Sequence, residues 1–141
     1  MNMFVVIAGA GKVGSSLATW ILDAGYEVAV IDIDDNKLKT LSSRLGDVVV
    51  LGDTISPNDL EKCGISRADI FIAATDVEDV NLISCQVVKS RYEVTTTAAV
   101  VFNSESEELF DLLGVDITLK VPDMIVQGLQ ERLSESFAVD L

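Results

Sequence analysis

Six short apolar segments recur along the chain, separated by stretches of mixed polarity. The segments are rich in β-branched residues, which is typical of buried strands; they are residues 3–8, 27–32, 47–52, 69–74, 94–102 and 116–121. Between them, apolar residues stand three and four positions apart, as Val80, Ile83 and Val87 do, and this spacing predicts helices with one buried face. The pattern therefore predicts strands that alternate with helices.

Residues with strong local preferences stand at the ends of these segments. Gly25 and Gly114 lie where two helices should stop, because glycine readily adopts the left-handed conformation that ends a helix. Ser56 precedes a proline, which is a typical helix start, and Ser104 has a glutamate three positions later, as a capping box requires. These signals place helix boundaries where the apolar spacing changes.

The alternation predicts an α/β fold. Near-continuous apolar strands imply a sheet covered on both faces, and connections long enough to hold a helix imply parallel pairing. We expect residues 1–121 to form a single Rossmann-like domain, a doubly wound parallel sheet of six strands in the order 3-2-1-4-5-6.

A further helix is predicted after the last strand, over residues 122–141. Met124, Ile125, Leu129 and Leu133 form an apolar stripe along its first part. Such a stripe could pack back on the domain, join a second copy as a dimerisation surface, or begin a linker to a domain that this chain lacks.

Composition and charge exclude several classes of function. The 141 residues are 49% apolar, which suffices for a sizeable core. A net charge of −13 repels nucleic-acid phosphates and anionic lipid headgroups, so we expect binding to neither. No apolar run reaches the roughly 18 residues of a membrane-spanning helix. Because glycines interrupt the N-terminal apolar run before it could act as a signal peptide, we expect a cytoplasmic protein without direct membrane insertion.

The rare residue types limit the chemistry further. The chain has no histidine, which is the commonest general base and metal ligand at neutral pH. Its two cysteines, Cys63 and Cys85, lie far apart in apolar surroundings without a CxxC spacing, and we expect both to be buried and reduced. We therefore predict no catalytic residue and no metal site.

Three glycines fall within six positions directly after the first apolar segment. The stretch Gly9-Ala10-Gly11-Lys12-Val13-Gly14 links the first predicted strand to the first predicted helix, the context in which a GxGxxG pattern binds the pyrophosphate of a dinucleotide. The first glycine makes the tight turn, the second leaves room for the pyrophosphate, and the third lets the helix pack closely on the strand. Free amides at the helix N-terminus attract phosphate locally, so even an acidic chain can bind this anion.

An acidic residue ends the second predicted strand. Asp32 stands eighteen positions after Gly14, followed by Ile33, and its carboxylate can accept hydrogen bonds from both ribose hydroxyls of an adenosine. The same carboxylate would repel a 2′-phosphate, which favours NAD(H) over NADP(H). The alternative is a glycine turn and a surface aspartate in a domain without a ligand, and the spacing favours the binding site.

Further candidates follow the third strand and lie in the glycine stretch. Asp53 and Thr54 come directly after the third predicted strand, where ligands enter an open α/β sheet. Asp53 could meet the adenine edge or amino group, or serve only as a turn or capping residue. Lys12 could reach a terminal phosphate, or lie in solvent.

The end of the fourth predicted strand supplies the last candidates. Ala73, Ala74 and Thr75 stand there, and the last two could lie under the phosphate and the second ribose. Thr75 or Asp76 could instead be only the N-cap of the next helix.

Taken together, these residues resemble the TrkA-N domain, also called KTN or RCK, of potassium uptake and channel systems. The resemblance covers about residues 3–133, and "GDT" at 52–54 and "EDVNL" at 78–82 set it apart from ordinary dehydrogenases. It implies a cytosolic regulatory subunit or domain that binds NAD(H), ATP, ADP or AMP and forms homodimers or larger rings. Its partner would be a membrane-embedded cation transporter or channel, which it gates by a ligand-dependent conformational change.

The resemblance also assigns positions. Gly9, Gly11, Gly14, Asp32 and Asp53 match positions that the family uses for its ligand; Lys12 matches a basic position near the phosphates in ATP-binding members; Val100 stands where the fifth strand often carries a basic residue. That difference leaves the exact nucleotide open, with NAD(H) favoured.

Two other functions stay open at this stage. The chain could be the cofactor-binding domain of an NAD-dependent oxidoreductase, although the sequence offers no histidine and no second domain for a substrate. It could also be an α/β scaffold that has lost its ligand and keeps only an oligomer interface.

Overall fold

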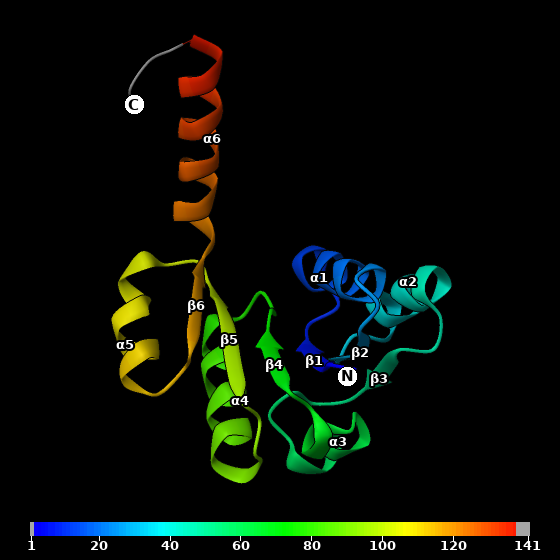
Figure 1. Ribbon diagram of the computed structural model, residues 1–141. Coiled ribbons are helices and arrows are strands. Elements are labelled where there is room, and N and C mark those ends of the chain that lie inside the picture. The colour runs from blue at the N-terminus through cyan, green and yellow to red at the C-terminus, as the bar shows by residue number, and fades with distance from the viewer. Residues whose placement is uncertain (1, 138–141) are drawn as a thin grey trace.

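Six parallel strands form one sheet in a computed structural model that describes residues 2–137 (Figure 1). The strand order is β3-β2-β1-β4-β5-β6, which confirms the predicted doubly wound topology. The strands are β1 (Phe4–Ala8), β2 (Glu27–Asp32), β3 (Val49–Leu51), β4 (Ile70–Ala73), β5 (Thr96–Val101) and β6 (Ile117–Lys120). Each lies within one of the six segments that the apolar pattern predicts.

Helices follow the strands and cover both faces of the sheet. They are α1 (Lys12–Asp23), α2 (Asp35–Leu45), α3 (Pro57–Lys62), α4 (Glu78–Arg91), α5 (Glu107–Leu112) and α6 (Val121–Phe137), with 3₁₀ turns η1 (Ile65–Arg67) and η2 (Ser104–Ser106). Helices α1 and α2 lie on one face, and α3 and α4 lie on the other (Figure 1).

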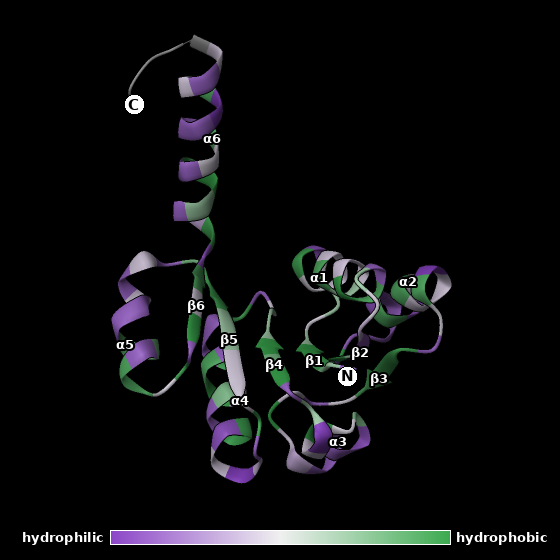
Figure 2. Ribbon diagram, in the orientation of Figure 1, coloured by the Kyte–Doolittle hydropathy of each residue, from purple (hydrophilic) through white to green (hydrophobic). Residues whose placement is uncertain are grey.

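The core consists of two apolar layers, one on each face. Alternate residues of β1 point into different layers: Val5 and Ile7 pack with α1 and α2, whereas Phe4, Val6 and Ala8 pack with α3, α4 and α5. Figure 2 shows hydrophobic residues concentrated along the central strands β1 and β4. The double layer explains why the strands are apolar at every position rather than at alternate ones.

Several local predictions are confirmed. Gly25 and Gly114 have φ values of 88° and 89° just beyond α1 and α5, the left-handed conformation expected of helix ends. The hydroxyl of Ser56 accepts a hydrogen bond from the amide of Asp59 at 3.4 Å and caps α3.

The predicted capping box at Ser104 is wrong. Ser104 lies inside η2, and α5 begins only at Glu107. Its hydroxyl donates to Asp123 Oδ1 at 2.6 Å, so this polar side chain joins α6 to the loop before α5 instead of capping α5. Asn103 caps η2, because its side-chain oxygen accepts from the amide of Glu105 at 3.1 Å.

Both cysteines are buried with free thiols, as predicted. Cys63 is 5% exposed and Cys85 is 1% exposed. Burial raises the pKa of each thiol to about 12, so both stay protonated at neutral pH. Their role is therefore to fill the core.

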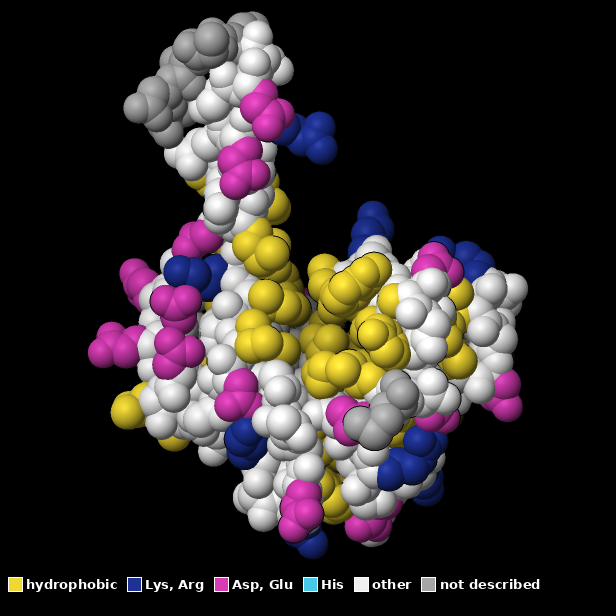
Figure 3. Space-filling view, in the orientation of Figure 1, with side chains coloured by type: hydrophobic (Ala, Val, Ile, Leu, Met, Phe, Trp, Pro, Cys, Tyr) yellow, Lys and Arg dark blue, Asp and Glu magenta, His cyan; other side chains and the backbone are white. Residues whose placement is uncertain are grey.

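Helix α6 leaves the body of the domain directly after β6 (Figure 1). It begins at Val121, one residue before the predicted start, and residues 138–141 of the predicted segment lie outside the described residues. Met124, Ile125 and Leu129 are 53%, 66% and 58% exposed, so this part of the apolar stripe does not pack back on the sheet. Figure 3 shows hydrophobic side chains gathered over the base of α6 and the part of α1 that faces it.

Polar contacts hold the base of α6. Lys120 Nζ lies 3.2 Å from a carboxylate oxygen of Glu107 and 3.2 Å from one of Asp123, and Ser104 adds its hydrogen bond to Asp123. We call these four residues the α6 joint. Among residues 2–137, no helix has both the length and the apolarity to cross a bilayer.

Candidate functional site

The carboxyl ends of five strands meet around a cleft of about 580 Å³. Strands β1 to β5 each lead into a loop or helix that contributes to its wall. The lining residues are Gly9, Gly11, Lys12, Val13, Asp32, Ile33, Asp34, Lys37, Asp53, Thr54, Ala74, Thr75, Asp76, Val77, Val80 and Phe102. The cleft lies at the point where the strand order reverses, between β1 and β4, which is where open α/β sheets bind ligands.

The structure brings most of the predicted site residues together. Those that line the cleft are Gly9, Gly11, Lys12, Val13, Asp32, Ile33, Asp53, Thr54, Ala74 and Thr75. Ala10, Gly14 and Ala73 lie behind this wall and are buried. Ligand contact by any of these residues stays a prediction.

Two of the three motif glycines are required by packing. Gly9 has φ of 114°, and a Cβ there would lie 2.6 Å from the carbonyl oxygen of Ala74. A Cβ on Gly14 would lie only 1.8 Å from the carbonyl oxygen of Gly9. The loop after β1 is therefore pressed against both α1 and the end of β4.

Gly11 differs from the other two glycines. A Cβ there would meet no atom within 4 Å, so its bare backbone faces open space at the cleft. Gly11 is the N-cap of α1, and no side chain caps this helix. The first amides of α1, with the positive end of the helix dipole, are thus available to an anion.

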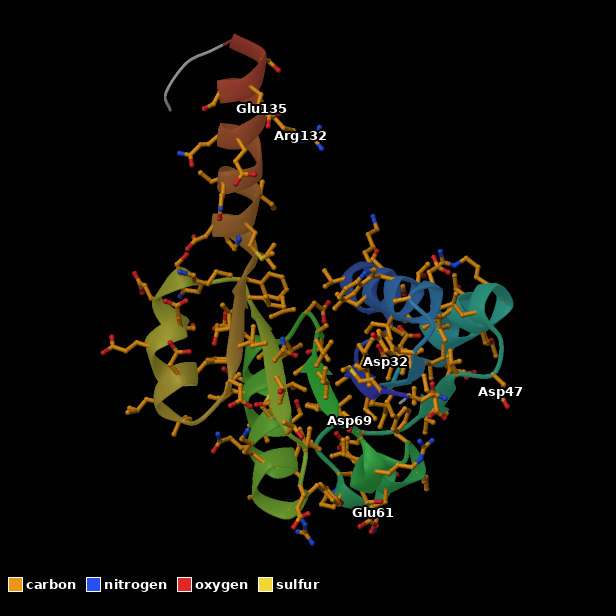
Figure 4. The ribbon with its side chains drawn as sticks, in the orientation of Figure 1. Asp32, Asp47, Glu61, Asp69, Arg132 and Glu135 are labelled. Carbon is orange, nitrogen blue, oxygen red and sulfur yellow. The ribbon has the colours of Figure 1, made fainter. Side chains whose placement is uncertain are left out.

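Asp32 fixes the shape of the site as well as its charge. Its side chain is 8% exposed, and its Oδ2 accepts from the amide of Ala10 at 2.7 Å while its Oδ1 accepts from the amide of Asp34 at 2.8 Å. The carboxylate therefore ties the glycine loop to the end of β2; Figure 4 shows it below α1. Each oxygen keeps a further lone pair for a ligand hydroxyl. The adjacent Ile33, 74% exposed, offers an apolar surface to a base.

The loop after β3 is also braced. The amide of Asp53 donates to Asp59 Oδ2 at 2.8 Å, and Asp53 Oδ1 accepts from the amide of Ile55 at 3.0 Å. The hydrogen bond from the amide of Asp53, with the one from Lys62, holds the pKa of Asp59 below its ordinary value. Asp53 thus acts as a turn residue and lines the cleft at once.

Asn81 is a structural residue that the sequence analysis included only as part of "EDVNL" at 78–82, with no role of its own. Its side chain is fully buried in α4, and its Oδ1 accepts from the amide and hydroxyl of Thr75 at 3.0 and 2.6 Å. Its Nδ2 donates to the carbonyl oxygens of Thr75 and Val100 at 3.0 and 2.9 Å. Asn81 therefore clamps the ends of β4 and β5 together. The apolar spacing gave no signal for it, because the buried residues of α4 are Asn81, Ser84, Cys85 and Val88 rather than the predicted face, and Ile83 of that face is 45% exposed.

Neither Thr75 nor Asp76 is the N-cap of α4, so that alternative is wrong. Val77 occupies the N-cap position. The hydroxyl of Thr75 instead faces Asn81 and accepts from the amide of Val77 at 3.3 Å. Val100 stands where the fifth strand of the family often carries a basic residue. It is 1% exposed within the core and does not line the cleft.

Further residues of the cleft wall were missed. They are Asp34, Lys37, Asp76, Val77, Val80 and Phe102, of which Asp76 was considered only as a possible helix N-cap. Phe102 directly follows β5, and Lys37 and Val80 lie in the first turn of a helix that follows a strand. The rule that located the other candidates, that ligands enter at strand ends, could have found these too.

The TrkA-N domain family model matches residues 5–120. The chain belongs to the TrkA-N domain family. Among TrkA-N relatives, it is 34% identical over 131 residues to a Trk system potassium uptake protein TrkA homolog of Methanothermobacter thermautotrophicus, covering 93% of this chain and 60% of that protein. It is 33% identical over 113 residues to the Trk system potassium uptake protein TrkA of Streptomyces coelicolor, covering 80% and 51%. The chain thus spans only part of the length of these relatives.

Solved structures share the TrkA-N fold. The TrkA-N domain of the inner membrane protein ybaL from Escherichia coli aligns with a TM-score of 0.85 at 16% identity, over 94% of this chain and 98% of that one. The GsuK channel bound to NAD aligns with a TM-score of 0.73 at 20% identity, over 84% and 21%. The Shewanella denitrificans Kef CTD in its AMP-bound form aligns with a TM-score of 0.78 at 22% identity, over 95% and 81%.

Proposed function

We propose that this TrkA-N domain is a nucleotide-sensing regulatory module of a potassium transporter or channel. The observation that carries the proposal is the cleft at the switch point, which is lined by the open backbone of Gly11, in the loop after β1, and by Asp32, at the end of the neighbouring strand β2. The names of the TrkA relatives support the transport context. The NAD-bound and AMP-bound neighbours support an adenine nucleotide as the ligand.

NAD(H) is the ligand that we propose first. The β2 and β3 side of the cleft carries Asp32, Ile33 and Asp53, which suit the ribose and base of an adenosine. The wall continues past the glycine loop to the ends of β4 and β5, so the cleft crosses both halves of the sheet, as a dinucleotide requires. ATP, ADP and AMP are the competing ligands.

The module would work without catalysis. A nucleotide that binds two conformations with different affinity shifts their populations, and no bond needs to form or break. We propose α6 as the element that transmits this shift, because it leaves the domain and exposes Met124, Ile125 and Leu129. A second copy would cover this stripe in a homodimer or larger ring, on the cytoplasmic side of the membrane partner.

Calorimetric titration tests the proposal. The protein is titrated with NADH, NAD⁺, ATP, ADP and AMP, and the series is repeated with Asp32→Ala and with Asp47→Ala, an exposed carboxylate outside the cleft wall (Figure 4). We expect one ligand to bind tightly and to weaken about tenfold or more only in Asp32→Ala, because hydrogen bonds to a charged group contribute about 1.5–3 kcal/mol.

Other outcomes would select the competing functions. Binding by none of the nucleotides would refute the sensing module and favour a scaffold without a ligand. Turnover of bound NAD⁺ with small hydroxy acids would refute the non-catalytic mechanism and favour the oxidoreductase.

A further inference from the structure

One end of the cleft is apolar. Where the wall is formed by α4 and the loop after β5, its side chains are Val77, Val80 and Phe102. Val77 is 51% exposed and Phe102 is 42% exposed, so both present apolar surface to solvent. Across the carboxyl ends of the strands, four spacings of about 4.8 Å between neighbouring strands separate the end of β3 from the end of β5. This apolar end is therefore well separated from Asp53.

The position of Phe102 is fixed by a carboxylate outside the cleft wall. Glu78 Oε1 accepts from the amides of Phe102 and Asn103 at 2.9 and 3.1 Å, and Glu78 Oε2 accepts from the hydroxyl of Ser106 at 2.5 Å. Burial opposes the charged form of Glu78, but these three hydrogen bonds together hold its pKa below the ordinary value. A charged Glu78 thus anchors the loop that carries Phe102. Glu78 itself directly follows Val77 in the sequence.

We propose that Phe102 is a specificity-determining residue that packs against the second ring of a dinucleotide, and that Glu78 is the positioning residue that holds it there. The inference rests on the proposed function, since it assigns the second ring to the half of the cleft that a bound adenosine would not fill. A flat ring that packs on Val77 and Phe102 removes their exposed apolar surface from water, which contributes favourable binding free energy.

A terminal phosphate is disfavoured at the same place. Asp76 lines this end, and the Glu78 carboxylate lies within hydrogen-bond distance of the amide of Phe102, so a further phosphate would meet like charge. The apolar residues offer that phosphate no hydrogen-bond donor in return. The end of the cleft therefore selects a nicotinamide ring over the terminal phosphate of ATP.

The test compares NADH with ADP-ribose, which keeps the adenosine and both phosphates but lacks the second ring. In the unaltered protein we expect NADH to bind more tightly than ADP-ribose. Phe102→Ala should weaken NADH about ten- to hundredfold, the usual effect of removing an aromatic stacking partner, and leave ADP-ribose within about twofold. Leu112→Ala, at an 80% exposed position on α5, is the matched control and should change neither affinity.

Glu78 is tested by a pair of variants. Glu78→Ala removes the anchor and should weaken NADH selectively, as Phe102→Ala does. Glu78→Gln keeps an acceptor for the two amides, so it should retain more of the NADH preference than Glu78→Ala. The readout is the ratio of the two affinities, with nicotinamide fluorescence as a second signal, because a general loss of stability would leave that ratio unchanged.

The outcomes separate the two proposals. If NADH and ADP-ribose bind and Phe102→Ala weakens both equally or neither, the assignment of Phe102 is overturned while nucleotide sensing stands. If Glu78→Ala leaves the ratio unchanged, its positioning role is overturned. If neither ligand binds the unaltered protein, the proposed function fails and this inference fails with it.

Discussion

Replacing Gly14 with alanine should damage the fold, whereas replacing Gly11 should cost the fold little and act mainly on ligand binding. The Cβ of Gly14→Ala would lie 1.8 Å from the carbonyl oxygen of Gly9, and real contacts of this kind do not fall below 3.0 Å, so α1 and the loop must separate by about 1.2 Å. Both sides of this contact are backbone, which places the cost near the upper end of the 1–3 kcal/mol typical of overpacking, about 3 kcal/mol. For a chain of this size that corresponds to a fall in Tm of about 10 °C.

Gly11→Ala is the matched variant, because its Cβ meets nothing within 4 Å and the φ of Gly11 is −74°. We expect a loss of about 0.5–1 kcal/mol, since alanine is a poorer N-cap than glycine. The added methyl group would occupy the space through which a phosphate approaches the amides of α1, and lost hydrogen bonds to a charged group should weaken binding about tenfold or more.

Urea unfolding and calorimetric titration of both variants would decide the question. Comparable stability of the two variants would refute the reasoning on packing. Nucleotide affinity in Gly11→Ala equal to that of the unaltered protein would refute the assignment of Gly11 to the phosphates.

Three further predictions concern other parts of the molecule. Asn81→Ala should lower the free energy of unfolding by about 3 kcal/mol, measured by urea unfolding, because it removes the hydrogen-bond partner of the buried Val100 carbonyl and of two part-buried backbone groups of Thr75; an effect below about 1 kcal/mol would contradict the clamp. The lowered pKa of Glu78 stabilises the fold above its ordinary value of 4.5, and this stabilisation is lost as the pH falls through the folded pKa, so unfolding of Glu78→Gln should depend less on pH between about 5 and 3; identical acid dependence would count against it. Met124→Glu with Leu129→Glu should yield monomers by light scattering that still bind nucleotide, because both positions are exposed; unchanged assembly would show that α6 is not the interface.

The strand order could be predicted because it depends on features that are local in sequence. Apolar strands of similar length, joined by segments with helical spacing, leave few ways to cover both faces of a sheet. The glycine motif and Asp32 were found for the same reason, since each stands at a fixed place relative to a strand end. These signals required no knowledge of which distant side chains meet.

The residues that were missed depend on contacts between distant segments. Ser104 has the right spacing for a capping box, but its hydroxyl donates instead to the carboxylate of Asp123, nineteen positions later. Asn81 reads as an ordinary helix residue until β4 and β5 are placed beside it. Phe102 looks like the end of a core strand, and only the hydrogen bonds that the amides of its loop donate to Glu78 show that it stays at the cleft.

The α6 joint makes the hold on this helix sensitive to dissolved salt. Lys120, Glu107 and Asp123 are 30%, 41% and 45% exposed, so mobile ions reach the contacts that hold the base of α6. The screening length falls from about 10 Å at 0.1 M salt to about 3 Å at 1 M, which weakens partly exposed ion pairs. Val121 at the start of α6 also packs against the core, and this apolar contact does not depend on salt in the same way. We therefore expect the hold on the base of α6 to weaken as ionic strength rises, even with no nucleotide bound.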